Sequence, residues 1–266
     1  MEKSNIVYYY CDLNTGLSIL KNNELWLTSI RNMNDSNEEI SIYKIFCNML
    51  RKYDCEKQLN AFFSLADISG YFQSYKHSLA ANPYYVACFS KDGDSVSQWN
   101  LYADKGQGIA IGFDELEFKR LDNEDIINYY NVEYIDSNII QKEAKEIYEI
   151  MLNINTNNGG RLMDVFVKYI SEKYGNPEQY KSSHYSSEKE VGIVYKEKTM
   201  PAREINGWKL GNVDVYAKRN CINTYMPLVF PKSAVKEIVL GPMYQKNYFE
   251  VDVAIRGYLN MERLLR

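Results

Sequence analysis

The sequence predicts a single α+β domain over residues 1–266, in which helices pack on one central β-sheet. Three observations favour this class. Short apolar and aromatic runs typical of strands recur along the chain, helical periodicity lies between several of them, and a hydrophobic content of 45% is enough for a sizeable core. Pro177, Pro201 and Pro231 fall in loop-like stretches and mark no clear domain boundary.

The chain begins with a predicted strand, a capped helix and a second strand. Ile6 to Tyr10 is a short β-type run, and the carboxylate of Asp12 suits the N-cap of the following helix. Asn22 and Asn23 end that helix, and Leu25 to Thr28 is the next predicted strand. We expect the apolar face of the helix to consist of Leu13, Leu17 and Leu20.

A polar loop follows the second strand and concentrates an arginine, amides and carboxylates. Its members are Arg31, Asn32, Asn34, Asp35, Glu38 and Glu39. Ligands often bind at such loops, and Asn34 or Asp35 is alternatively a helix cap. Residues from about 36 to 78 are predicted to form a helical insertion that covers the core.

The stretch from Cys88 to Phe113 predicts a strand, a turn, a short helix and a second strand in close succession. Tyr84 to Phe89 is strand-like, and the acidic turn at residues 92–94 offers an N-cap for a helix from Ser95 to Ala103. The continuous apolar run from Ile109 to Phe113 is typical of a buried strand.

On the short helix, Ser95, Trp99 and Tyr102 are spaced to share one face. Such a hydroxyl and two aromatic rings would line the wall of a binding site. The alternative is ordinary core packing, which is the commoner role of aromatic residues at helical spacing.

The rest of the chain alternates between the two element types. Predicted strands are Ile126 to Tyr134, Val191 to Tyr195, Cys221 to Phe230 and Val235 to Leu240. Predicted helices are Gln141 to Leu152, Leu162 to Tyr174 and Tyr244 to Leu259, with a turn-rich stretch from Asn153 to Gly160.

Composition excludes several function classes. A formal charge of -4 and a pI near 5.4 provide no general basic surface for duplex nucleic acid or an anionic membrane. The first residues show no secretory pattern, and no long apolar run predicts a membrane span, so we expect a cytoplasmic protein.

Histidine and cysteine usage limits the chemistry further. The 5 cysteines are scattered without a CxxC pair, which is typical of reduced thiols. With 2 histidines and no HExxH or cysteine cluster, we expect no metal site. The chain has 24 tyrosines, and each supplies both a stacking face and a polar tip. We therefore expect any catalytic chemistry to rely on carboxylates, hydroxyls and aromatic rings.

Several short motifs together resemble the bacterial family of unknown function DUF2971, and they span nearly the whole chain. That family has a YHYT-like strand, LWLTS, an NDP-E loop, a phenylalanine-serine strand end, an acidic turn, W-x-x-Y-A, G-x-x-I-G-F, E-x-E-x-R and I-x-I/L-G-P. The matching positions here are Tyr8 to Cys11, Leu25 to Ser29, Asn34, Asp35, Glu38, Phe89, Ser90, Asp94, Trp99, Tyr102, Ala103, Gly108, Ile111 to Phe113, Glu188, Glu190 and Ile238 to Pro242. Tyr9 replaces the histidine of YHYT, and Gly192 replaces the arginine after E-x-E.

The motif order is in turn similar to that of ADP-ribosyltransferases, which implies an ADP-ribosyltransferase-like mixed central sheet and NAD as substrate. The resemblance implies catalytic roles for Glu190 and its neighbour Glu188. It places the NAD-binding groups at Tyr9, Tyr10, Arg31, Asn34, Asp35, Ser90, Ser97, Trp99 and Tyr102.

The E-x-E pair has a chemical reading and a plainer one. Side chains at i and i+2 of a strand point the same way, so both carboxylates could meet one substrate. Glu188-Lys189-Glu190 is alternatively a solvated edge of alternating charge.

Two hypotheses therefore stand. The first is an ADP-ribosyltransferase that uses NAD and modifies a nucleic acid or a protein, as a toxin or effector in bacterial anti-phage defence. The second is a binding module that keeps the fold without the chemistry and binds a nucleotide or partner protein.

Overall fold

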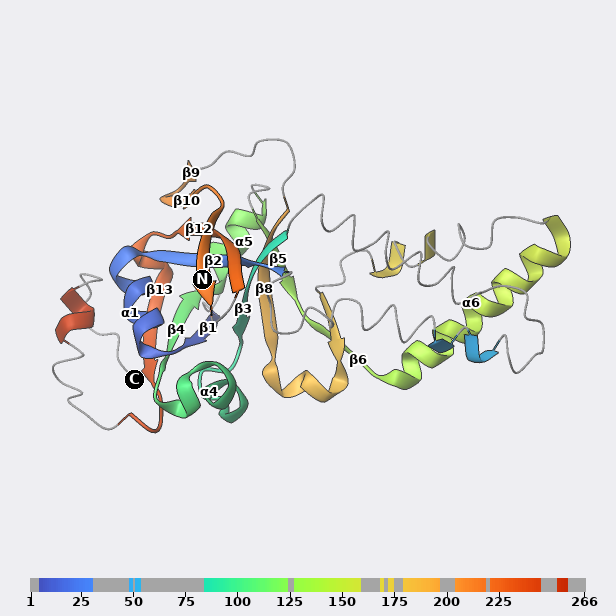
Figure 1. Cartoon of the computed structure of the whole chain (residues 1–266), viewed down its shortest axis with the longest axis horizontal. Helices are drawn as coiled ribbons and strands as arrows, with labels where there is room; N and C mark the ends of the chain where they lie inside the picture. The colour runs from blue at the N-terminus through green and yellow to red at the C-terminus, as the bar shows by residue number, and fades with distance from the viewer. Residues whose placement is uncertain are drawn as a thin grey trace. The chain divides into compact units, whose positions relative to one another are not determined.

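The computed structural model describes residues 5–30, 48–49, 51–53, 84–123, 127–158, 168–169, 172–174, 179–196, 204–218, 221–244 and 253–257. The chain divides into two compact units (Figure 1). The first comprises Met1–Met33, Pro83–Asn131 and Ser187–Arg266, and the second comprises Asn34–Asn82 and Val132–Ser186. The single-domain expectation remains a prediction.

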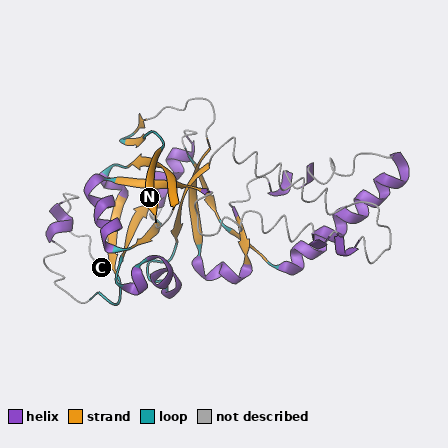
Figure 2. Cartoon of the chain, viewed as in Figure 1, coloured by secondary structure: helices purple, strands orange, loops and turns teal. Residues whose placement is uncertain are grey.

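The described residues of the first unit form an 11-stranded antiparallel sheet with helices around it (Figure 2). One path through the sheet runs β13-β4-β1-β3-β2-β12-β10-β9, while β11 pairs with β12, and β8 pairs with β3 and β5. The strands are β1 (Ile6–Cys11), β2 (Glu24–Ser29), β3 (Tyr84–Ser90), β4 (Ile109–Asp114), β5 (Asn128–Asn131), β8 (Glu190–Lys196), β9 (Glu204–Ile205), β10 (Trp208–Leu210), β11 (Asp214–Lys218), β12 (Cys221–Val229) and β13 (Val235–Leu240). The prediction that the strands of Tyr9, Phe89, Ile111 and Glu190 share one sheet is confirmed.

The sheet forks at β3, because this strand has three partners. β8 pairs along the whole of one edge, from Tyr84 opposite Lys196 to Ser90 opposite Glu190. The other edge is shared between β2, which pairs at Val86, and β1, which pairs only at Ser90. Two branches therefore leave β3: a first branch of β1, β4 and β13, and a second branch of β2, β12 and their neighbours.

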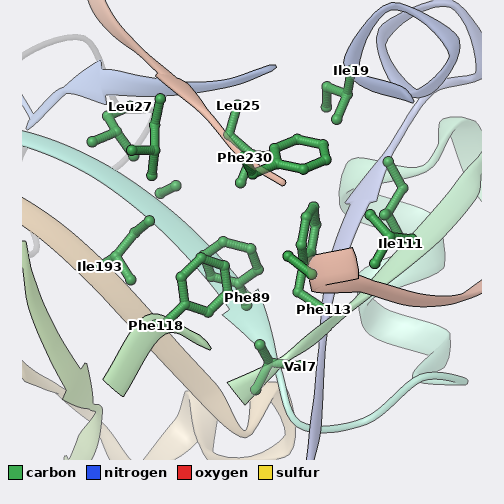
Figure 3. Packing of buried hydrophobic residues seen from close by; sticks show 14 of the residues in the cluster. Val7, Ile19, Leu25, Leu27, Phe89, Ile111, Phe113, Phe118, Ile193 and Phe230 are labelled. Atoms are coloured by element: carbon green, nitrogen blue, oxygen red, sulfur yellow. The ribbon is translucent and has the colours of Figure 1, made fainter. Parts of the chain in front are cut away.

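One hydrophobic core joins the two branches (Figure 3). The ring of Phe113 in β4 lies 5.9 Å from that of Phe89 and 5.2 Å from that of Phe230, which follows β12. Phe118 of α5 (Glu115–Asn123) adds a further ring, 4.9 Å from Phe89. Such offset and edge-on aromatic contacts bury large apolar areas, so the core holds the fork in place.

The capped first helix is confirmed with one correction to its buried face. α1 (Leu13–Asn22) has Asp12 at its N-cap, and Asn23 ends it in the left-handed conformation. The buried face consists of Gly16, Ile19 and Leu20, while Leu17 is exposed, so the predicted leucine stripe was partly wrong. Gly16 suits this face because a Cβ there would lie 2.3 Å from the side chain of Ile109.

Other elements differ from the sequence-based expectation. The sheet of the first unit is antiparallel rather than mixed, because hairpins such as β11–β12 need no crossover. The predicted strand 126–134 is two strands, β5 and β6 (Glu133–Ile135), in different sheets. The sequence also missed α5, β7 (Tyr180–Ser182), β9, β10 and β11.

The second unit contains α6 (Ser137–Asn158), which continues through most of the predicted turn at residues 153–160. The short strands β6 and β7 (Tyr180–Ser182) pair in parallel. Glu143 of α6 accepts hydrogen bonds from Lys173 and Tyr174, which ties α6 to the segment at residues 172–174. No helix in the described ranges has the length and apolarity that a membrane span requires.

Several predictions fall on positions outside the described residues. These are the polar loop with Arg31, Asn34 and Asp35, nearly all of the insertion at residues 36–78, and most of the helices predicted at 162–174 and 244–259.

Candidate functional site

A row of three side chains crosses the fork on one face of the sheet. Tyr8 of β1 lies opposite Ser90 of β3, and Ser90 lies opposite Glu190 of β8. Residues directly opposite one another in a ladder point to the same side, so the three share what we call the site face. All three are buried, and Glu190 is only 8% exposed.

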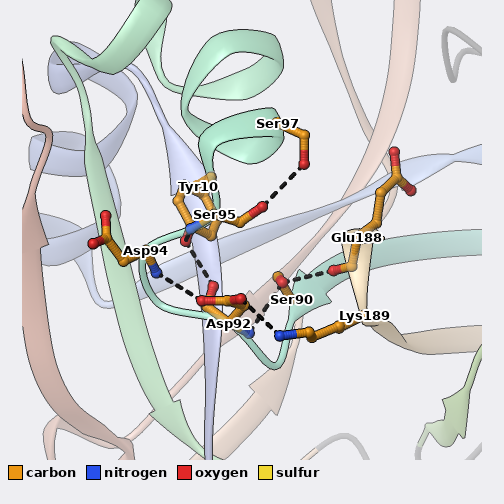
Figure 4. Close-up of polar contacts among 8 residues, drawn as sticks. All are labelled: Tyr10, Ser90, Asp92, Asp94, Ser95, Ser97, Glu188 and Lys189. Carbon is orange, nitrogen blue, oxygen red and sulfur yellow. Dashed lines mark hydrogen bonds and ion pairs between the residues drawn. The ribbon is translucent and has the colours of Figure 1, made fainter. Parts of the chain in front are cut away.

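The turn after β3 is fixed by hydrogen bonds to its own backbone and to the β8 side (Figure 4). The Ser90 hydroxyl donates to the carbonyl of Glu188 at 2.6 Å and accepts from the amide of Asp92 at 3.1 Å. The amide of Lys91 donates to the carbonyl of Lys189. The Lys189 ammonium lies 2.9 Å from the Asp92 carboxylate. The hydrogen bond from Lys189 lowers the pKa of Asp92, and the hydrogen bond from the Asp94 amide and the positive charge of Lys189 lower it further.

Tyr10 fastens the same turn from the β1 side. Its hydroxyl donates to the carbonyl of Asp92 at 2.6 Å and accepts from the amide of Ser95 at 3.1 Å. Burial raises the pKa of Tyr10 to about 12, so it stays a neutral donor at physiological pH. The rings of Tyr8 and Tyr10 belong to a small cluster with Trp99, Ala103 and Ala110.

The short helix α4 (Val96–Tyr102) does not present the predicted aromatic wall. Trp99 is 3% exposed, meets Tyr10 edge-on at 4.7 Å and donates from Nε1 to Asp94 at 2.9 Å. Tyr102, by contrast, is 42% exposed. The hydroxyls of Ser95 and Ser97 lie 3.0 Å apart. Trp99 is therefore a core-packing residue rather than part of an exposed binding-site wall.

The E-x-E geometry expected for Glu188 and Glu190 is corrected by the backbone. Glu188 ends the 3-10 helix η4 (Ser183–Glu188), Lys189 is left-handed with φ of 46°, and only Glu190 belongs to β8. The two-residue periodicity of a strand therefore does not apply to this pair. Both carboxylate residues are nevertheless buried rather than lying on a solvated edge.

Gly192 marks a close approach that explains one departure from the family motif. Gly192 of β8 lies opposite Tyr130 of β5, and a Cβ at Gly192 would lie 2.3 Å from the Tyr130 ring. The tyrosine ring occupies the space in which an arginine side chain would begin.

Tyr9 lies on the opposite side of β1 from Tyr8 and Tyr10, because side chains alternate along a strand. Its ring packs against the main core and meets Phe89 at 5.7 Å. Burial raises the pKa of Tyr9, with smaller contributions from Cys11, Cys88 and Tyr216. Of the predicted site residues, Ser90 lies directly opposite Glu190, while Tyr10 shares the site face of β1 with Tyr8 and contacts Trp99.

Sequence reasoning missed three participants of this site: Tyr8, Asp92 and Lys189. Tyr8 could have been found from alternation, because it is two residues from Tyr10. The pairing of Asp92 with Lys189, 97 residues apart, left no signal in the sequence. Among the described residues, no group of three or more potential metal ligands is clustered.

The family described as Protein of unknown function (DUF2971) has a model that matches residues 98–193, which confirms the resemblance to that family over this part of the chain. The motif matches outside residues 98–193 stay predictions. The match runs from α4 to β8 and includes Trp99, Tyr102, Glu188 and Glu190. No curated protein matches the chain, and no solved structure matches it.

Proposed function

We propose that the protein is an ADP-ribosyltransferase-like enzyme that cleaves NAD, and that it acts as a toxin or effector in bacterial anti-phage defence. The observation that carries the proposal is the buried carboxylate residue Glu190, at the start of β8 and in one row with Ser90 and Tyr8. Its backbone position is fixed by the ladder with β3, as a preorganised catalytic group requires.

The proposed reaction breaks the bond between the nicotinamide nitrogen and C1 of the ribose. The bonding electrons leave with nicotinamide, positive charge develops on the sugar, and a nucleophile of the target forms the new bond to C1 while losing its proton. A carboxylate that accepts a hydrogen bond from a ribose hydroxyl stabilises this charge most strongly in the transition state. Glu190 is assigned that role.

The second candidate function is binding of a nucleotide or a partner protein without chemistry. Two observations favour it. Tyr130 occupies the space beside Gly192, and the hydroxyl of Ser90 and the indole of Trp99 are engaged in hydrogen bonds within the protein. Under this second function, Tyr8, Ser90 and Glu190 stabilise the junction of β1, β3 and β8 and take no part in a reaction.

The test compares wild type with Glu190→Gln, and uses Glu204→Gln at an exposed position in β9 as the matched control. Each purified protein is incubated with labelled NAD and bacterial lysate, and free nicotinamide and labelled RNA, DNA and protein are measured. We expect Glu190→Gln to keep the fold and most NAD binding but to lose ~100-fold or more in rate, because the lost interaction strengthens in the transition state.

Growth arrest on expression should follow the same pattern, with arrest by wild type and Glu204→Gln but not by Glu190→Gln. If wild type and Glu190→Gln are equally silent in all four biochemical measurements while a partner still binds both, the binding module replaces the enzyme.

A further inference from the structure

The second branch carries a group of three aromatic residues that we call the aromatic platform: Trp26, Tyr216 and Tyr225. Trp26 stacks on Tyr225 with ring centroids 4.0 Å apart and an interplanar angle of 28°, and Tyr216 lies 5.4 Å from Trp26 at 48°. Tyr225 is buried beneath this stack, but Trp26 is 40% exposed. An indole ring is thus held by its neighbours and presented to solvent.

Strand register places the platform on the site face. Thr28 of β2 lies opposite both Val86 of β3 and Tyr225 of β12. Val86 points to the same side as Ser90, four residues further along β3, and Trp26 points to the same side as Thr28. The platform therefore shares a sheet face with Glu190, on the other branch of the fork.

Two carboxylates border the platform. Glu24 accepts a hydrogen bond from Nε1 of Trp26 at 2.8 Å, and Asp214 accepts one from the Tyr225 hydroxyl at 3.2 Å. Burial raises the pKa of Tyr225, and the negative charges of Asp214 and Glu24 raise it further. The negative potential of both carboxylates therefore reaches the Tyr225 hydroxyl. An aromatic face with acidic neighbours attracts cations and repels phosphate groups.

We propose that the aromatic platform binds an arginine side chain displayed by a partner protein. A guanidinium is planar and cationic, stacks on indole faces and donates in its plane to carboxylates, which fits Trp26 with Glu24 and Asp214 better than a compact ammonium does. The net charge of -4 also favours a basic partner over a nucleic acid. The identification of this partner as the acceptor of ADP-ribose rests on the proposed function, whereas the binding itself does not.

The protein offers a built-in probe for this site. Of its 3 tryptophans, Trp99 and Trp208 are 3% and 1% exposed, so quenching by acrylamide in water reports on Trp26. A blocked Gly-Arg-Gly-Arg-Gly peptide should protect this fluorescence saturably without NAD, and a lysine analogue should protect it less. Protection by the lysine peptide equal to that by the arginine peptide, or equal protection by a single-stranded oligonucleotide, would overturn the proposal.

Variants test the assignment, with binding measured by anisotropy of the labelled arginine peptide. Trp26→Leu should weaken binding by ~2- to 30-fold, the range of a single cation–π contact. Glu24→Gln and Asp214→Asn keep hydrogen-bond acceptors while removing charge, and each should also weaken binding. Trp26→Phe, with unchanged circular dichroism, controls for folding and should retain part of the affinity. Unchanged binding by folded Trp26→Leu would contradict the proposal, whether or not NAD cleavage is observed.

Discussion

Trp99 and Trp26 have similar local surroundings and opposite exposures. Each indole lies near a tyrosine ring and donates from Nε1 to a carboxylate close in sequence, Asp94 for one and Glu24 for the other. Trp99 is buried in the cluster with Tyr8 and Tyr10, whereas Trp26 is the exposed top of a stack. The sequence predicted a binding role for Trp99, but it is the ring of Trp26 that is exposed to solvent.

The difference teaches that an aromatic residue near a site can either build the site or meet a ligand. Trp99, Tyr10 and Ser90 hold the turn that ends β3, so they position the backbone next to Glu190. Trp26 does not hold this turn, because its ring packs on Tyr225 of β12 and Tyr216 of β11. Stability measurements can separate these roles.

The largest expected effect is on stability at Trp99. Trp99→Ala removes a fully buried ring and should lower the free energy of unfolding by about 3–5 kcal/mol, while Trp26→Ala should lower it by about 1 kcal/mol or less. Urea denaturation followed by far-ultraviolet circular dichroism measures both. Similar losses of unfolding free energy in Trp99→Ala and Trp26→Ala would contradict the assignment of a structural role to Trp99 alone.

A smaller effect is expected at the hydroxyl that joins β3 to the β8 side. Ser90→Ala removes the donor to the Glu188 carbonyl and the acceptor of the Asp92 amide in a buried setting. Unsatisfied buried groups cost about 1–3 kcal/mol, which is the expected loss of unfolding free energy. Glu24→Ala, which removes an acceptor from the more exposed tryptophan, is the matched control, and it should cost less than Ser90→Ala.

The smallest effect concerns the ion pair of Asp92 with Lys189. The pKa of Asp92 is lowered in the folded protein, so its stabilising contribution is present above the unfolded pKa of about 4 and is lost as pH falls through the folded value. At neutral pH the free energy of unfolding of the wild type should be higher than that of Asp92→Asn by about 0.2–1 kcal/mol. The difference is small because the ion pair is partly exposed. The difference should shrink as pH falls below the unfolded pKa of about 4, and it should also shrink in 1 M salt, as measured by thermal melts. A difference that grows on acidification would show that another group is responsible.

The sequence by itself determined the elements whose signals are local. The Asp12 cap, the strands around Tyr9, Phe89, Ile111 and Glu190, and the family resemblance could all be predicted, because alternation, apolar runs and capping chemistry act over a few neighbouring residues. The helix α5 was not predicted, because it is short and only Phe118 and Leu121 of its three apolar residues belong to the main core, where their partners lie elsewhere in the chain.

Only the tertiary structure decided which side chains meet. The pairings of β3 with β1 and β8 place Tyr8, Ser90 and Glu190 in one row, so that Tyr8 rather than the alternating Tyr9 lies beside Ser90. The left-handed Lys189 takes Glu188 off the strand, and the ring of Tyr130 occupies the space beside Gly192. These outcomes depend on pairings between residues tens of positions apart, and the pattern within one segment does not specify the register or the partner of a strand.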